Sequence, residues 1–140
     1  MSIESTDYVL DCFAMFAYFT GEPGGSKVKD LMKKALRNEV SLHMSIINLG
    51  ELFYMACKKL GRTKTLLIVS DAKSLPINIV SVTDSQVWSA AELKANFNIS
   101  YADAFAASLA QSLEASVVTG DPEFKDIQNG IKIFWILSDS

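Results

Sequence analysis

Residues 100–122 read SYADAFAASLAQSLEASVVTGDP, and this stretch decides the fold. The richness of Tyr101–Leu113 in Ala, Phe and Leu predicts a helix, from Ser100 to Glu114, that is almost entirely buried. The apolar pair Val117-Val118 predicts the core of a strand, and Gly120-Asp121-Pro122 predicts a turn after it. A buried helix followed by a fully apolar strand is typical of a parallel α/β sheet.

The rest of the chain repeats this alternation of short apolar runs and helical periods. The pattern predicts strands at 8–10, 39–43, 77–80, 117–118 and 131–136. It predicts helices at 12–20, 26–36, 46–60, 63–72, 83–95 and 100–114. Strands separated by helices imply right-handed crossovers, so we expect one α/β domain over residues 1–140, with a central parallel sheet flanked by helices in three layers.

Composition favours a soluble, cytoplasmic protein without a membrane segment. The 140 residues are 49% hydrophobic, which suffices for one core without disulfide bonds. The two cysteines, Cys12 and Cys57, are far apart, and the first eight residues lack the basic charge of a signal peptide. No apolar run reaches the ~18 residues of a membrane span. A single histidine, His43, excludes a histidine-rich metal site within one chain.

Charge is unevenly distributed along the chain. The total is −3, but residues 27–73 contain ten basic and four acidic residues, so the remainder is strongly acidic. A basic surface of this kind meets polyanions or acidic partners, although solvated helix faces explain it equally well. The basic residues after the helix of residues 46–60 are the best candidates for contacts to an RNA backbone: Lys58, Lys59, Arg62 and Lys64.

Four carboxylates occupy positions that helix capping or solvent exposure explains only in part. Asp11 follows the first strand, where it can cap the next helix and also face the crevice at the sheet's carboxyl edge. Glu51 lies on a narrow polar stripe of its helix, facing solvent or a cleft. Asp103 completes an S-x-x-D capping box on the buried helix, and Asp121 is placed to cap a turn that starts at Pro122.

The set as a whole points to a metal site. No Lys or Arg lies between Lys94 and Lys125 to neutralise Asp103 or Asp121 from nearby sequence. If the four carboxylates meet at the switch point of the sheet, a hard divalent cation relieves their repulsion. Oxygen ligands alone favour Mg²⁺ or Mn²⁺ over Zn²⁺. A water held by such a cation can attack phosphorus.

Four segments in order resemble the PIN domain family, and within it the VapC-type toxin ribonucleases of toxin–antitoxin pairs. The segments are Val9–Asp11, Ser45–Leu52, Ser100–Ala110 and Val117–Phe124. The resemblance implies a Rossmann-like sheet and a Mg²⁺- or Mn²⁺-dependent endoribonuclease that hydrolyses phosphodiester bonds in RNA. It also implies a homodimer and, for a toxin of a type II system, an antitoxin that inserts a basic segment into the acidic crevice.

The resemblance also assigns roles to residues. Asp11 and Asp103 become the principal metal ligands. Glu51 and Asp121 complete the catalytic cluster and help to hold the metal or to position the attacking water, and Thr119 hydrogen-bonds a neighbouring carboxylate. Glu123 is a secondary candidate, because a cap on the turn after Pro122 also explains it.

The sequence departs from the family after the first aspartate. Many members have Thr-Ser or Ser-Ser there, whereas this chain has Cys12-Phe13, so a supporting hydroxyl is missing. Cys12 itself is expected to be a packed side chain rather than a nucleophile. Two alternatives therefore stay open beside the toxin: a PIN-like module that binds RNA or protein without turnover, and a PIN nuclease of RNA processing.

Overall fold

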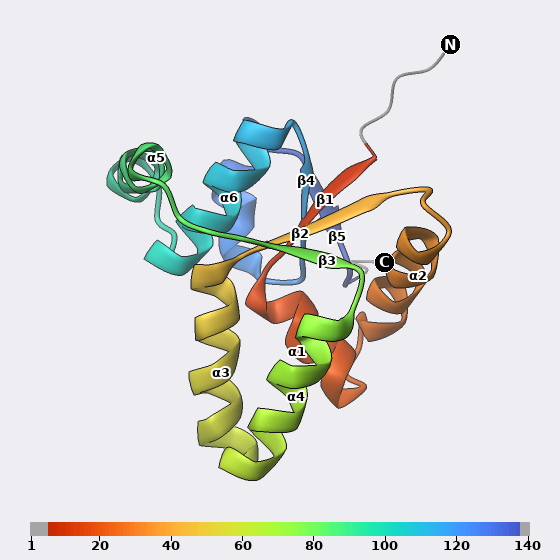
Figure 1. Cartoon of the computed structure of the whole chain (residues 1–140). Coiled ribbons are helices and arrows are strands. Elements are labelled where there is room, and N and C mark those ends of the chain that lie inside the picture. The colour runs from red at the N-terminus through yellow and green to blue at the C-terminus, as the bar shows by residue number, and fades with distance from the viewer. Residues whose placement is uncertain (1–5, 138–140) are drawn as a thin grey trace.

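A five-stranded parallel sheet forms the centre of the computed structural model, which describes residues 6–137 (Figure 1). The strands are β1 (Asp7–Leu10), β2 (Ser41–Ser45), β3 (Ile77–Val80), β4 (Ser116–Thr119) and β5 (Ile133–Trp135). Their order in the sheet is β3-β2-β1-β4-β5, and every neighbouring pair is parallel. The predicted fold class is thus confirmed; both ends of the predicted 1–140 domain lie outside the described residues.

Helices cover both faces of the sheet. They are α1 (Cys12–Thr20), α2 (Gly25–Leu36), α3 (Ile46–Leu60), α4 (Arg62–Ser74), α5 (Asp84–Asn96), α6 (Tyr101–Leu113) and the 3₁₀ helix η1 (Pro122–Ile127). The side chains of α1 to α4 share one apolar core, and those of α5, α6 and η1 share another. Consecutive strand residues point to opposite faces, so Val9 enters the second core and Leu10 the first.

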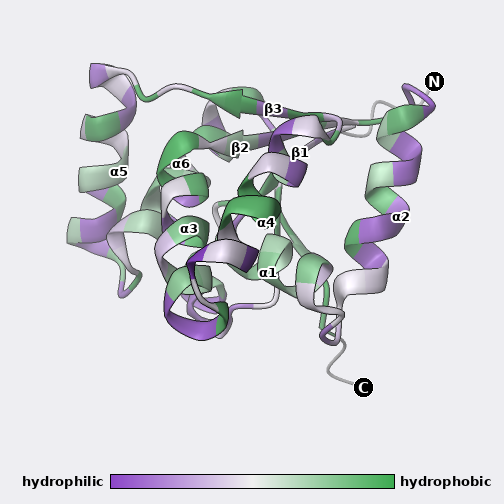
Figure 2. Ribbon diagram, turned by 60° about the horizontal axis from the view of Figure 1, so that its bottom comes forward, coloured by the Kyte–Doolittle hydropathy of each residue, from purple (hydrophilic) through white to green (hydrophobic). Residues whose placement is uncertain are grey.

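Amphipathic patterning explains how an outer helix packs. In α2 the buried residues Val28, Leu31, Met32 and Ala35 alternate with exposed lysines. Figure 2 shows this alternation of hydrophobic and hydrophilic residues along α2. In contrast, α6 buries every residue from Asp103 to Ala110, as its composition predicts. Within residues 6–137, no helix is both long and apolar enough to cross a membrane.

Most element boundaries differ from the prediction by one or two residues, and the largest differences lie in two strands and one turn. The second strand is Ser41–Ser45 rather than residues 39–43, because residues 37–40 form the turn after α2, in which the Glu39 N–H donates to the Lys34 carbonyl at 2.9 Å. Strand β5 covers only Ile133–Trp135 of the predicted 131–136. The turn at Pro122 continues as η1, with proline in its first turn as predicted.

The strand order places a switch point at β1. The chain proceeds from β1 to β2 and β3 on one side, and then returns to β4 and β5 on the other. Residues that follow β1 and β4 therefore meet at one crevice, at the carboxyl edge of the sheet. This crevice is where the candidate site lies.

Candidate metal centre

Asp11 links the end of β1 to the start of α1. It is the N-cap of α1, and its Oδ1 accepts a hydrogen bond of 2.8 Å from the backbone N–H of Ala14. The Thr119 hydroxyl, at the end of the neighbouring β4, donates to Asp11 Oδ2. Both side chains are buried, with Asp11 only 1% exposed. Asp11 is therefore a helix cap and also a carboxylate fixed at the switch point, so the two expectations for it hold together.

Asp103 lies in the first turn of α6, and its carboxylate does not accept a capping hydrogen bond from the Ser100 N–H. Ser100 caps the helix, its hydroxyl accepting from the Asp103 N–H at 3.1 Å. In a full capping box the acidic side chain would return this bond to the Ser100 N–H. Here Glu123 accepts that bond, at 3.1 Å, from a position 23 residues further along the chain. The Asp103 side chain, 5% exposed, is left to face the crevice.

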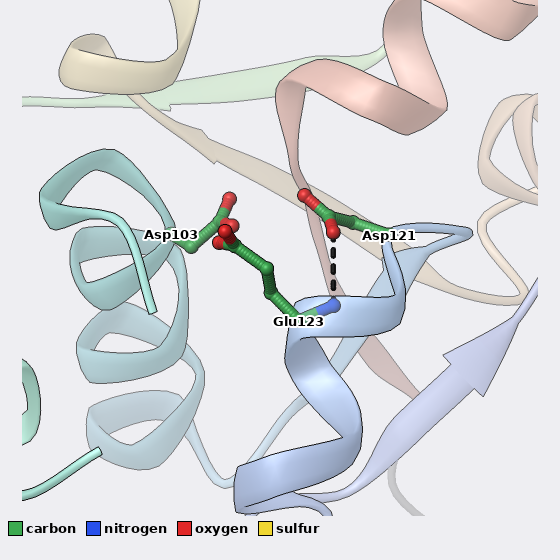
Figure 3. A group of neighbouring side chains, drawn as sticks. All are labelled: Asp103, Asp121 and Glu123. Atoms are coloured by element: carbon green, nitrogen blue, oxygen red, sulfur yellow. Dashed lines mark hydrogen bonds between the residues drawn. The ribbon is translucent and has the colours of Figure 1, made fainter. Parts of the chain in front are cut away.

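Asp121 and Glu123 enter the crevice from the segment after β4. The Asp121 N–H donates to Thr119 Oγ1 at 2.9 Å, and the Glu123 N–H donates to Asp121 Oδ1 at 2.9 Å. Figure 3 shows the carboxyl groups of Asp103, Asp121 and Glu123 converging from α6 and η1. One oxygen from each lies within 4.8 Å of the other two.

Glu51 approaches from α3 and is half-buried. Its Oε1 accepts from Asn48 Nδ2 at 3.4 Å, one turn earlier in the same helix. Burial is the main cause that raises the pKa of Glu51, and the negative charges of Asp121 and Glu123 add to it, so Glu51 interacts electrostatically with the carboxylates after β4. We call Asp11, Glu51, Asp103, Asp121 and Glu123 the acidic cluster.

Burial and mutual repulsion raise the proton affinity of the acidic cluster. Burial is the main cause that raises the pKa of Asp11 to about 7, opposed by the Thr119 and Ala14 hydrogen bonds. Burial, the contact with Glu123 and the charge of Asp11 raise the pKa of Asp103. Burial also raises the pKa of Glu51. A bound cation would relieve both causes, since it compensates the lost solvation and separates the like charges.

The donor set suits a hard divalent cation. All five members of the cluster offer carboxylate oxygens, the ligands that Mg²⁺ and Mn²⁺ accept. The one histidine is committed elsewhere, with His43 Nε2 3.0 Å from Asp7 Oδ1. The nearby thiol of Cys12 contacts the thioether of Met55 rather than a carboxylate, and burial raises its pKa. The residues present thus fit a Mg²⁺ or Mn²⁺ site.

The segment Cys12-Phe13 packs around this site without joining it. Cys12 is buried, and its Sγ lies 3.6 Å from Met55 Sδ. This is the packed role predicted for it. Gly120 lies between Thr119 and Asp121 in the sequence, and the Phe13 ring packs against it. The contact is so close that a Cβ on Gly120 would overlap the ring. The position that carries a hydroxyl in many relatives therefore contributes an aromatic contact here.

The four basic residues proposed for RNA lie at the far end of α3 and the start of α4. Lys58 and Lys59 stand two turns beyond Glu51, about 10 Å along the helix axis. Three of the side chains lie over aromatic rings: Lys58 over Tyr54, Lys59 over Phe16 and Arg62 over Phe53, at 5.1 to 5.8 Å from the ring centroids. The structure does not place them within the acidic cluster.

Sequence reasoning underrated two residues of the site. Glu123 was a secondary candidate, yet it completes the group of three and takes over the capping bond of α6. Asn48 has no role in the sequence-based prediction, but it is fully buried beside Glu51. Both depend on contacts between elements far apart in the chain, which local spacing does not reveal. A separate cavity of about 650 Å³, lined by Tyr18, Glu22 and Lys29 among others, contains no member of the acidic cluster.

Comparisons with known proteins agree with this fold. The family model of the PIN domain matches residues 8–130, so the chain belongs to the PIN domain family. No curated protein matches the chain by sequence.

Solved structures of toxin–antitoxin proteins share the fold at low sequence identity. VapBC2 from Rickettsia felis, bound to a promoter DNA fragment, is 21% identical with a TM-score of 0.71, over 91% of this chain and 97% of that one. VapBC from Salmonella typhimurium, also bound to DNA, is 22% identical with a TM-score of 0.70, over 93% and 98%. VapC20 from Mycobacterium tuberculosis, a toxin that cleaves the sarcin–ricin loop, is 16% identical with a TM-score of 0.69, over 89% and 95%.

Proposed function

We propose that this protein is a Mg²⁺- or Mn²⁺-dependent endoribonuclease, the toxin of a type II toxin–antitoxin pair. The observation that carries the proposal is the group formed by Asp103, Asp121 and Glu123 at the switch point of a PIN fold, with Asp11 and Glu51 close enough to interact with it electrostatically. No purely structural need explains this arrangement, because gathering like charges in a buried crevice costs stability.

The roles of the residues follow from their positions. A divalent cation bound here would stabilise charge on the phosphoryl oxygens and favour ionisation of an attacking water. Asp11 and Asp103, the two most buried carboxylates, are assigned to hold the cation, and Asp121 and Glu123 to complete its surroundings. Thr119 holds Asp11 in place through its hydroxyl. Glu51, half-buried and with a raised pKa, is assigned to help hold the cation and to position the attacking water with its carboxylate.

The substrate and partners are assigned from charge. The phosphate backbone of RNA is assigned to the basic surface formed by Lys58, Lys59, Arg62 and Lys64, about two helical turns from Glu51. The acidic crevice is assigned to a basic segment of an antitoxin. The toxin–antitoxin complexes among the similar structures support such a partner. As a toxin acting on cellular RNA, the protein is placed in the cytoplasm, as a homodimer.

The test is cleavage of RNA by the purified full chain. A panel containing transfer RNA and a sarcin–ricin loop hairpin is incubated with Mg²⁺, with Mn²⁺ and with chelator. The proposal expects cleavage that requires the cation and is lost in Asp103→Asn, which keeps the side-chain shape but removes a charge. The control variant is Asp71→Asn, an exposed aspartate of α4. Equal cleavage by Asp103→Asn and wild type would refute it.

One competing function has a specific observation in its favour. Phe13 occupies the place of a hydroxyl residue and packs on Gly120 inside the site. A folded protein that binds RNA or a protein partner but cleaves nothing in the panel would identify a PIN-like binding module instead. Cation-dependent cleavage without growth arrest on expression would favour an RNA-processing nuclease over a toxin.

A further inference from the structure

Asn48 is a fully buried polar residue at a junction between two helices. It lies in the first turn of α3, which begins at Ile46. Its Nδ2 donates to the backbone oxygen of Ala102 in α6 at 3.1 Å, across 54 residues of sequence. The same Nδ2 donates to Glu51 Oε1 at 3.4 Å. One amide group thus joins a carboxylate of α3 to the residue that precedes Asp103.

The orientation of this amide follows from its neighbours. Both contacts are acceptors, a carbonyl and a carboxylate, so the nitrogen must face them and the oxygen must face away. In the described part of the chain, Asn48 Oδ1 is a buried side-chain oxygen without a hydrogen-bond partner. Buried polar atoms are rarely left unpaired. An apolar side chain of the same size would avoid this cost, which indicates that the two donated bonds are what the site requires.

We propose that Asn48 is a positioning residue of the acidic cluster, which sets Glu51 in register with Asp103 by tying the first turn of α3 to the first turn of α6. The proposal rests on the proposed function, since it assigns a role toward the divalent cation. Glu51 has no other hydrogen bond among those found in residues 6–137. Without Asn48, its carboxylate loses the contact that aims it, while Asp11, Asp103 and Asp121 keep theirs.

The test measures Mn²⁺ binding directly, by the loss of the free-ion signal in electron paramagnetic resonance. The main variant is Asn48→Leu, which has a similar volume and neither donates nor accepts. We expect its Mn²⁺ dissociation constant to rise about tenfold, the scale found when partners behind metal ligands are removed. Asn96→Leu is the matched control, because Asn96 also donates to a backbone carbonyl of a helix but is exposed on α5. It should bind Mn²⁺ as wild type does.

A double-mutant cycle separates positioning from a merely structural effect. If Asn48 acts through Glu51, Asn48→Leu should weaken binding less than threefold in a Glu51→Gln background. The same factor in both backgrounds, or wild-type binding by a folded Asn48→Leu, would overturn the proposal. If Asn48→Leu does not fold, Asn48→Thr enters the same cycle, since its hydroxyl can replace one of the two donated bonds. A wild-type chain that binds no Mn²⁺ would instead refute the proposed function.

Discussion

Removing the charge of Asp11 should stabilise the cation-free protein at neutral pH while it destroys the proposed function. The pKa of this carboxyl rises from 3.8 to about 7 on folding, mainly because the side chain is buried. Each pKa unit corresponds to about 1.4 kcal/mol, so the ionised carboxylate opposes folding by at most about 4 kcal/mol. Asp11→Asn removes this cost. The substitution also weakens the contact with Thr119, by about 1 kcal/mol. Relaxation of the wild-type site around the buried charge further reduces the upper limit of about 4 kcal/mol.

The net expectation is a gain of about 1–3 kcal/mol above pH 7. With an unfolding entropy of about 2 cal/mol/K per residue, that gain raises Tm by about 3–10 °C for this chain. The sign depends on pH as follows from the two pKa values. Below about pH 4 the carboxyl is protonated whether the chain is folded or unfolded, so the cost is absent. Between pH 4 and 7 only the unfolded chain releases the proton, and wild-type stability falls as pH rises.

Thermal unfolding followed by circular dichroism in chelator, from pH 4 to pH 8, measures this difference. The gain of Asp11→Asn over wild type should grow across that range and level off above pH 7. Saturating Mn²⁺ should reduce or reverse it, because the cation stabilises the carboxylate. Asp71→Asn should follow wild type throughout. A loss of stability in Asp11→Asn that is the same at every pH would refute the argument, because a lost cap alone would then explain it.

Three further predictions concern neighbouring features. Thr119→Val keeps the side-chain volume but removes the hydroxyl that donates to Asp11 and accepts from the Asp121 N–H. It should lower the free energy of unfolding in urea by about 1–3 kcal/mol, and Thr119→Ser should lower it less. Gly120→Ala places a methyl group into the ring of Phe13 and should lower both Tm and RNA cleavage. Gly50→Ala, in open space on a helix, should stabilise the fold by about 0.5–1 kcal/mol, and a loss of stability in both variants would contradict the packing argument. Arg62→Gln should reduce the slope of log affinity for single-stranded RNA against log salt by about 0.7, and an unchanged slope in filter binding would exclude a phosphate contact there.

The fold and most of the site could be predicted because their signals are local. The alternation of apolar runs with helical periods predicted the parallel sheet. Asp11, Asp103 and Asp121 follow predicted strands or open predicted helices. The structure confirms the caps made by Asp11 and Asp121, but only the Ser100 half of the predicted capping box, because Glu123 replaces Asp103 in the other half. Boundaries were less certain, since Glu39 has a strand-like neighbourhood and yet pairs with Arg37 in a turn.

The remaining features could not be predicted because they depend on tertiary contacts. The bond from the Ser100 N–H to Glu123 joins residues that only the sheet topology brings together. Glu51 shares its helical stripe with lysines and would suit a solvent-facing helix equally well. Only the packing of α3 against α6 turns it toward the crevice and buries Asn48 beside it.

Locating the cation in a crystal tests the central claim most directly. Crystals of the full chain grown with Mn²⁺ would be measured at the manganese absorption edge, where anomalous scattering identifies the ion without reference to the coordinates. We expect a peak among the carboxylates of Asp11, Asp103 and Asp121, with oxygen ligands and no sulfur. An empty acidic cluster at millimolar Mn²⁺, or a peak elsewhere only, would contradict it.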